Sequence, residues 1–164
     1  MLRSCLSLGL GLAVLGHLGD SPTERNKGLA RRWIEEGFNK RNLTLVDELF
    51  AERFAVNGHA IGREGLRQSM SRHIAAFPDL HVTIDDMVAE GGKVGLWYTV
   101  EGTHQGEFEG IPPTGKQVKW TGSDLLTIEG GKVSEGRFLS DSLGLLRQMG
   151  ASVSPPRTPP GTGP

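Results

Sequence analysis

Four long β-rich segments in the second half of the chain constrain its fold most. They cover Leu80–Val88, Lys93–Gly102, Gln117–Ile128 and Val133–Asp141, and two of the three connections are short turns with paired glycines. Short connections of this kind join antiparallel neighbours in a sheet. The sequence therefore predicts a meander of four strands.

Helical patterns come before these strands. Ser21-Pro22-Thr23-Glu24 has a helix N-cap serine, proline at the first helical position and glutamate at the third. Apolar residues then recur at helical spacing from Leu29 to Phe38, and a second short helix follows Thr44. A short strand is expected to begin at Phe54–Val56.

A third helix is predicted to open at Gly62 and to stop at Phe77-Pro78-Asp79, because a residue before proline disfavours helix. His73 falls on the apolar face of this helix. The order of helices followed by strands is typical of an α+β domain, in which N-terminal helices pack on one face of a strongly curved antiparallel sheet.

The two ends of the chain differ from its middle. We expect residues 1–20 to be a leader or disordered extension, residues 21–150 to form one domain, and residues 151–164 to be a disordered tail rich in Pro and Gly. The apolar run Leu6–Leu18 has the length of a signal-peptide core and is too short to span a membrane. Two interpretations stay open: an export signal within residues 1–16, or a non-native extension on a cytoplasmic protein.

Composition excludes several classes of function. The 164 residues carry a net charge of −1 with no basic stripe, so neither nucleic acid nor an anionic membrane is an expected partner. The single cysteine, Cys5, cannot form an intrachain disulfide or a cysteine metal site. No pair of potential ligands has a diagnostic metal spacing, and we expect neither a metal nor a cofactor.

The loop Gly102–Lys116 is the segment that most suggests a site. It places His104 at the end of one strand and turns through Pro112-Pro113, where the prolines cannot continue a sheet ladder. Asp141 follows at the end of the last predicted strand. Our hypothesis is that His104 and Asp141 face a common pocket.

Several motifs resemble the SnoaL-like polyketide cyclase family (ester cyclase-like) of the NTF2-like superfamily. They are Phe77-Pro78-Asp79-Leu80, Gly102-Thr103-His104-x-Gly106-x-Phe108, Gly110-Ile111-Pro112-Pro113-Thr114-Gly115-Lys116 and Asp141-x-x-Gly144-Leu145-Leu146-x-Gln148-Met149-Gly150. The resemblance covers about residues 26–150. It implies a cone-shaped α+β barrel, often dimeric through its sheet, with a cavity for a hydrophobic small molecule.

In those cyclases an aspartate on the last strand acts as general acid and base in an intramolecular aldol closure, while histidines and aromatic residues line the pocket. The resemblance assigns these roles to Asp141 and His104. One departure is that Gly136 and Arg137 stand where many relatives carry histidine and tryptophan.

A carboxylate in an apolar pocket has a raised pKa, which makes it a stronger base. We therefore expect Asp141 to be the catalytic base in such a pocket. The alternative is that Asp141 ends a strand and caps the next turn. Arg137 would lie on the same strand face, and pairing with it would lower the pKa of Asp141 and favour a binding role.

Further residues are candidates for substrate binding. They are His73, His59, Trp120, Arg137 and Phe77. For each there is a simpler interpretation, such as a core side chain for Phe77 or an exposed loop residue for a histidine. Asp124 is in the same strand phase as Trp120, and we interpret it as a solvated or strand-edge carboxylate.

The predicted function is cofactor-free acid–base chemistry on a hydrophobic carbonyl compound such as a polyketide. Aldol-type cyclisation, isomerisation and dehydration all need a base and a donor to an oxyanion, so the sequence leaves the three open. The alternative is a non-catalytic binding module for an apolar ligand. A homodimer or higher homo-oligomer is expected in either case.

Overall fold

The computed structural model describes residues 21–152. The predictions of a leader over residues 1–20 and of a disordered tail fall almost entirely outside these residues. Within the described part, no helix has both the length and the apolar character needed to cross a bilayer.

The first helix begins as the sequence predicts. Helix α1 covers Pro22–Arg32, and the hydroxyl of Ser21 accepts a hydrogen bond from the backbone N–H of Glu24 at 3.2 Å. The predicted helical segment then changes type, because Trp33–Asn39 form a π-helical segment, η1. π-Helical turns recur at functional sites, and this one contributes side chains to the cavity described below.

Two short elements and a longer helix follow. Helix α2 (Leu45–Leu49) leads directly into strand β1 (Phe50–Val56), a turn joins β1 to β2 (His59–Ala60), and helix α3 covers Gly62–Ala76. The predicted start and stop of α3 are confirmed. Thr44 immediately precedes α2 as expected, but its hydroxyl bonds the side chain of Asn42 and makes no capping bond to the helix.

The predicted meander is present with small shifts of boundary. It consists of β3 (His81–Glu90), β4 (Lys93–Thr103), β5 (Gln117–Glu129) and β6 (Lys132–Ser140). Helix α4 (Ser142–Met149) closes the fold.

The six strands form one sheet in the order β2-β1-β6-β5-β4-β3. All neighbours are antiparallel except β1 and β6, which run parallel. The expectation of a wholly antiparallel sheet was therefore wrong at this pair. Parallel neighbours require a long connection, and here the connection contains α3 and the rest of the meander.

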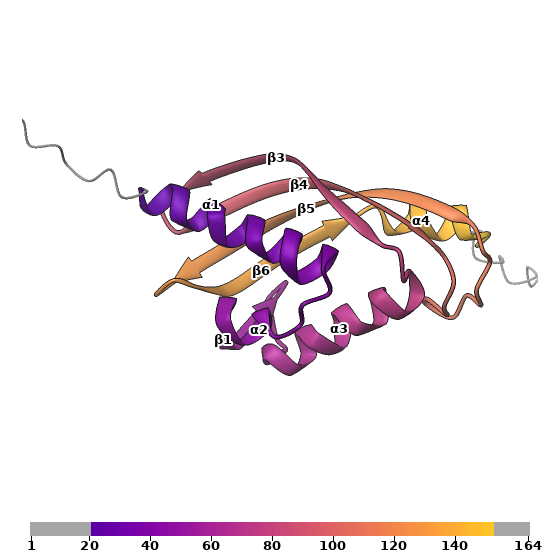
Figure 1. The fold of residues 1–164 in the computed structure, drawn as a ribbon, viewed down its shortest axis with the longest axis horizontal. Coiled ribbons are helices and arrows are strands. Elements are labelled where there is room, and N and C mark those ends of the chain that lie inside the picture. The colour runs from indigo at the N-terminus through magenta and orange to yellow at the C-terminus, as the bar shows by residue number, and fades with distance from the viewer. Residues whose placement is uncertain (1–20, 153–164) are drawn as a thin grey trace, which may run out of the picture.

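The helices lie on the concave side of the curved sheet (Figure 1). The long strands β3, β4 and β5 arch across the molecule, α1 and α3 lie beneath them, and α4 sits beside β5. The buried core between these layers includes Trp33, Phe50, Phe54, Met70 and Leu96. The architecture is that of an α+β fold with an open, curved sheet.

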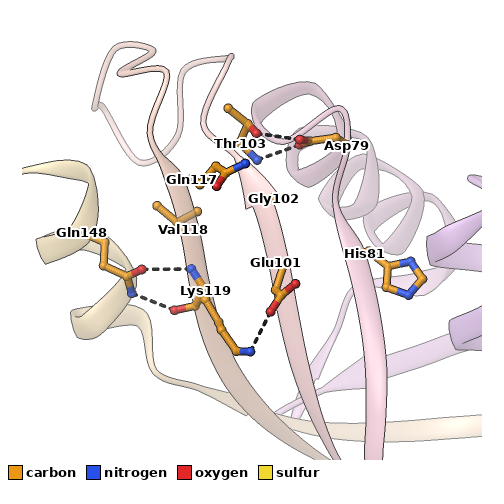
Figure 2. A pocket seen from close by; sticks show the side chains of 9 residues that line it. All are labelled: Asp79, His81, Glu101, Gly102, Thr103, Gln117, Val118, Lys119 and Gln148. Atoms are coloured by element: carbon orange, nitrogen blue, oxygen red, sulfur yellow. Dashed lines mark hydrogen bonds and ion pairs between the residues drawn. The ribbon is translucent and has the colours of Figure 1, made fainter.

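Three amide side chains bond strand backbone groups at positions where no neighbouring strand is present to pair with them. Each one bonds both the backbone N–H and the C=O of a single strand residue, in the pairs Asn39 with Val82, Asn57 with Phe138, and Gln148 with Lys119. Figure 2 shows the Gln148 pair. Unpaired backbone groups in a sheet are costly unless other groups bond them, so these amides stand in for missing strands.

Asn39 gives the clearest test of this role. It joins the end of η1 to the outer edge of β3 through two bonds of 2.8 and 2.9 Å that are partly buried. Asn39→Ala should lower the free energy of unfolding by about 2 kcal/mol, since each bond contributes roughly 1 kcal/mol. Urea denaturation of the variant measures this loss.

Asn26→Ala is the matched control, because Asn26 makes a single exposed bond to the carbonyl of Gly91. It should cost less than about 0.5 kcal/mol. An Asn39→Ala loss no larger than that of the control would contradict the role given to Asn39.

Candidate functional site

A cavity of about 250 Å³ lies between the concave face of the sheet and the helices. Its wall is mostly apolar and aromatic and comes from η1, α3, the residue before β3, and four strands: Trp33, Ile34, Phe38, Met70, Leu80, Val82, Val100, Trp120 and Phe138. Leu139, which is 71% exposed and belongs to the outer face, reaches only its rim. Five polar side chains interrupt that wall: Ser69, His73, Tyr98, Asp124 and Ser140. A few polar groups in an apolar hollow are typical of small-molecule sites.

Asp124 is the carboxyl group of this cavity. The hydroxyl of Tyr98 donates a hydrogen bond of 3.0 Å to its Oδ1. Burial raises the pKa of Asp124 to about 7, while the Tyr98 bond opposes that rise. The pKa of Tyr98 is raised as well, first by burial and then by the nearby carboxylate. At neutral pH the carboxyl is therefore poised to accept or donate a proton.

Strand register brings these two groups together. Side chains alternate between the faces of a strand, so Trp120, Gly122 and Asp124 of β5 all face inward. Tyr98 of β4 lies directly opposite Gly122, and Leu96 lies opposite Asp124. Tyr98 therefore reaches Asp124 along the diagonal of the two strands.

His73 lines the cavity from α3. Its Nδ1 lies 2.9 Å from the backbone carbonyl of Ser69, and because a carbonyl can only accept, Nδ1 carries the proton. The other nitrogen, Nε2, is then an acceptor when the ring is neutral and a donor when the ring is charged. The edge of the ring packs against Phe108 with centroids 5.2 Å apart.

Trp120 also lines the cavity, whereas Phe77 lies behind it. Phe77 is fully buried and packs on Trp120 with ring centroids 5.3 Å apart. It supports the wall of the cavity without lining it.

His104 is buried away from the cavity. Its side chain is fully buried, Nδ1 lies 3.0 Å from the hydroxyl of Thr114, and Nε2 has no hydrogen-bond partner among the described residues. Its backbone bonds Gly115 and Lys116 across the base of the loop. The position of His104 is that of an anchor for the loop between β4 and β5.

The surroundings expected for Asp141 are not found. Asp141 is exposed, and its Oδ1 accepts the backbone N–H of Gly144 at 2.8 Å as the N-cap of α4. Strand β6 ends at Ser140, and position 141 is also one residue out of phase with Phe138 and Ser140, which face the cavity. Neither His104 nor Asp141 lines this cavity.

Arg137 and His59 lie outside the cavity as well. Arg137 is on the outer face of β6 and pairs with Glu135 at 3.3 Å, so the considered pairing with Asp141 does not occur. His59 is exposed in β2, the edge strand farthest from β3.

A second hollow, of about 440 Å³, lies at the end of the sheet near α4 (Figure 2). It is wider than the cavity, but it is open and polar. Its groups bond one another: Lys119 pairs with Glu101, and Asp79 accepts two bonds from Thr103. Because these groups are already partnered, the enclosed cavity with Asp124 is the better candidate site.

Asp124 is the residue that sequence reasoning assigned to the wrong environment. Its phase matched that of Trp120, which was the available signal, but nothing local reveals that helices cover this stretch of β5. Among the described residues, no three His, Cys, Asp or Glu side chains converge as metal ligands.

Comparison with known proteins places this geometry in context. No curated protein sequence shows significant similarity to the chain. Among solved structures, a proposed SnoaL-like polyketide cyclase from Jannaschia sp. CCS1 is 25% identical, with a TM-score of 0.74 over 82% of this chain and 99% of that one.

Two Streptomyces structures are also similar. AclR, a proposed hydroxylase from Streptomyces galilaeus, is 28% identical with a TM-score of 0.71 over 78% of this chain and 97% of its own. IdmH, a proposed polyketide cyclase from Streptomyces antibioticus, is 28% identical with a TM-score of 0.68 over 77% and 99%.

The sequence model of one family matches most of the chain. It covers residues 28–149, from the middle of α1 to the last residue of α4. The matched region therefore contains the whole cavity and every strand. The chain belongs to the SnoaL-like polyketide cyclase family.

Proposed function

We propose that the chain is a cofactor-free acid–base enzyme acting on a hydrophobic carbonyl compound such as a polyketide. The observation that carries the proposal is a carboxyl group with a pKa near 7 in an apolar cavity. We assign the acid–base role to Asp124, because the capping position of Asp141 lacks both the cavity and the burial.

Asp124 can supply the proton transfers of an aldol-type ring closure. Its free oxygen Oδ2 accepts a proton from a carbon flanked by carbonyls, and the electron pair of the broken C–H bond passes into an enolate. The enolate carbon then bonds to a second carbonyl carbon, and the resulting alkoxide takes the proton back from Asp124. Isomerisation and dehydration also remove one proton from carbon and return one: isomerisation returns it to another carbon, and dehydration gives it to a departing hydroxyl group that leaves as water.

The cavity limits the size of the group that reacts there. At about 250 Å³ it lies below the roughly 300–1,000 Å³ of clefts that enclose drug-sized ligands. A compound of one or two rings, or the reactive end of a larger one, fits this volume. The alternative of a non-catalytic binding module predicts the same size of ligand without turnover.

We also propose a homodimer formed through the outer face of the sheet. Val88, Trp97, Leu125 and Leu139 form an exposed apolar patch there, one residue from each of four adjacent strands, with exposed fractions of 37–71%. We call it the outer patch.

Charges at the two sides of the outer patch favour a second copy of the chain as its partner. Arg137 lies on the β6 side and Asp86 on the β3 side. A two-fold axis between β4 and β5 would place β6 of one copy over β3 of the other, so that each Arg137 meets an Asp86. A two-fold contact of this kind would be self-complementary in charge.

Asp124→Asn should lower turnover of a cyclisable carbonyl substrate by about 10²–10⁴-fold, the usual contribution of general acid–base catalysis. Ligand affinity should change little, because the amide keeps the shape of the side chain. Turnover by the wild type should rise with pH around a midpoint near 7 as Asp124 ionises. Steady-state kinetics and calorimetric binding measure the two effects.

Asp141→Asn is the matched control for that experiment. Asparagine caps helices as well as aspartate does, so this variant should keep both its fold and its turnover. A wild type that binds ligand without turnover would support the binding module. Equal, measurable turnover in wild type and Asp124→Asn would contradict the role given to Asp124, and a loss confined to Asp141→Asn would support the role first predicted for Asp141.

The raised pKa of Asp124 also predicts a pH-dependent stability. Between about pH 4 and 7 the folded chain retains a proton that the unfolded chain releases, so this group lowers the free energy of unfolding as pH rises. Asp124→Asn removes this pH-dependent fall in the free energy of unfolding. The free energy of unfolding of the variant should exceed that of wild type increasingly across this window, by about 4 kcal/mol at most. Denaturation measured from pH 4 to 8 checks this.

That stability gain does not depend on any substrate. A constant difference between wild type and variant from pH 4 to 8 would show that the carboxyl titrates normally. The acid–base assignment would then lose its physical basis.

Trp97→Arg should weaken the dimer at least about 100-fold, because buried tryptophans often dominate interfaces and two like charges would meet at the axis. Sedimentation across a range of concentrations measures this. Leu143→Arg is the control, since Leu143 is 45% exposed on α4, outside the strands that form the outer patch. A wild type that sediments as a monomer at 100 µM would contradict the dimer.

A further inference from the structure

Three aromatic rings of the cavity wall lie directly over glycines. A Cβ atom added to Gly37 would be 2.7 Å from the ring of Trp33, and one added to Gly122 would be 2.5 Å from Tyr98. One added to Gly136 would overlap the ring of Phe138. Real Cβ atoms essentially never approach other atoms so closely. Each glycine therefore leaves the space that its ring occupies.

Backbone conformation does not explain the glycine at position 122. Its φ is not positive, so any residue could adopt its backbone. Glycine is also disfavoured within strands, where it often marks a close approach of another group. Gly122 lies in the middle of β5, paired with Tyr98 on one side and Ser140 on the other. Glycine is needed at position 122 because a side chain would have no room there.

The space beside Gly122 is occupied by the end of the Tyr98 side chain, whose hydroxyl bonds Asp124. The added Cβ would meet Cζ and Oη of Tyr98, both at 2.5 Å. The ring thus crosses β5 at Gly122 and carries its hydroxyl to Oδ1 of Asp124, 3.0 Å away. A methyl group at position 122 would move the hydroxyl off the carboxyl group.

We propose that Gly122 is a positioning residue, which acts through Tyr98 to hold its hydroxyl on Oδ1 of Asp124 and leave Oδ2 facing the ligand. The catalytic meaning of this arrangement rests on the proposed function, but the arrangement itself can be measured without a substrate. Packing of an aromatic ring over a strand glycine also stabilises a sheet, so the test must separate the hydroxyl from the ring.

Carbon-13 NMR titration of the Asp124 carboxyl separates the effect of the Tyr98 hydroxyl from that of its ring. The Asp124 signal is assigned as the one that is missing from the spectrum of Asp124→Asn. Gly122→Ala and Tyr98→Phe should each raise its titration midpoint, by about one pH unit, because both remove a hydrogen bond to the charged form. The double variant should shift no further than Tyr98→Phe alone. His73 on α3 is the other histidine or carboxylate that lines the cavity among the described residues, and its ring is followed in the same spectra.

Gly95→Ala is the control, because Gly95 is a strand glycine on the outer face, and it should leave the midpoint unchanged. An unshifted midpoint in Gly122→Ala, or shifts that add in the double variant, would overturn the proposal. Neither result bears on whether Asp124→Asn loses turnover.

If Gly122→Ala does not fold, Gly122→Ala combined with Tyr98→Leu decides the question. Removing the ring relieves the contact, so the combined variant should fold and melt near the temperature of Tyr98→Leu alone. A combined variant that stays unfolded would show that position 122 acts on something other than Tyr98.

Discussion

Partial removal of one carboxyl group from water is the constraint on which the candidate site depends. Asp124 has a pKa near 7 because helices and aromatic rings cover the concave face where it lies. Burying an ionisable group is unfavourable unless it is bonded, and the Tyr98 hydroxyl supplies one bond. The same layer of helices that forms the hydrophobic core thus also sets the protonation of the site.

Most of the fold could be predicted from local patterns. Ser21-Pro22 defines the start of α1, Phe77-Pro78 ends α3, and glycine turns separate the strands, since these residues act through their own backbone preferences. Two features were not predicted: the π-helical turn at Trp33–Asn39 and the parallel pairing of β1 with β6. The pairing of β1 with β6 joins distant parts of the chain, which local spacing does not reveal.

The site was harder to predict because its chemistry depends on which carboxyl group the helices bury. Asp124 and Asp141 are the same residue type in or just after long β-rich segments, and the sequence gives no measure of which one is covered. The structure separates them: β5 continues through Asp124 with its face toward the helices, whereas β6 ends one residue before Asp141. The sequence left the surroundings of His104 equally open. In the structure its side chain is buried beside Thr114, where it supports the loop between β4 and β5.

The amide side chain of Asn39 has a consequence beyond stability. Strand β3 is an open edge of the sheet, and exposed edges are where other chains can add strands and begin aggregation. At Val82 both backbone groups are already occupied by Asn39. Farther along the same edge Asp85, Asp86 and Glu90 are exposed carboxylates that repel an incoming strand of like charge. This edge is thereby protected against intermolecular β-pairing along most of its length.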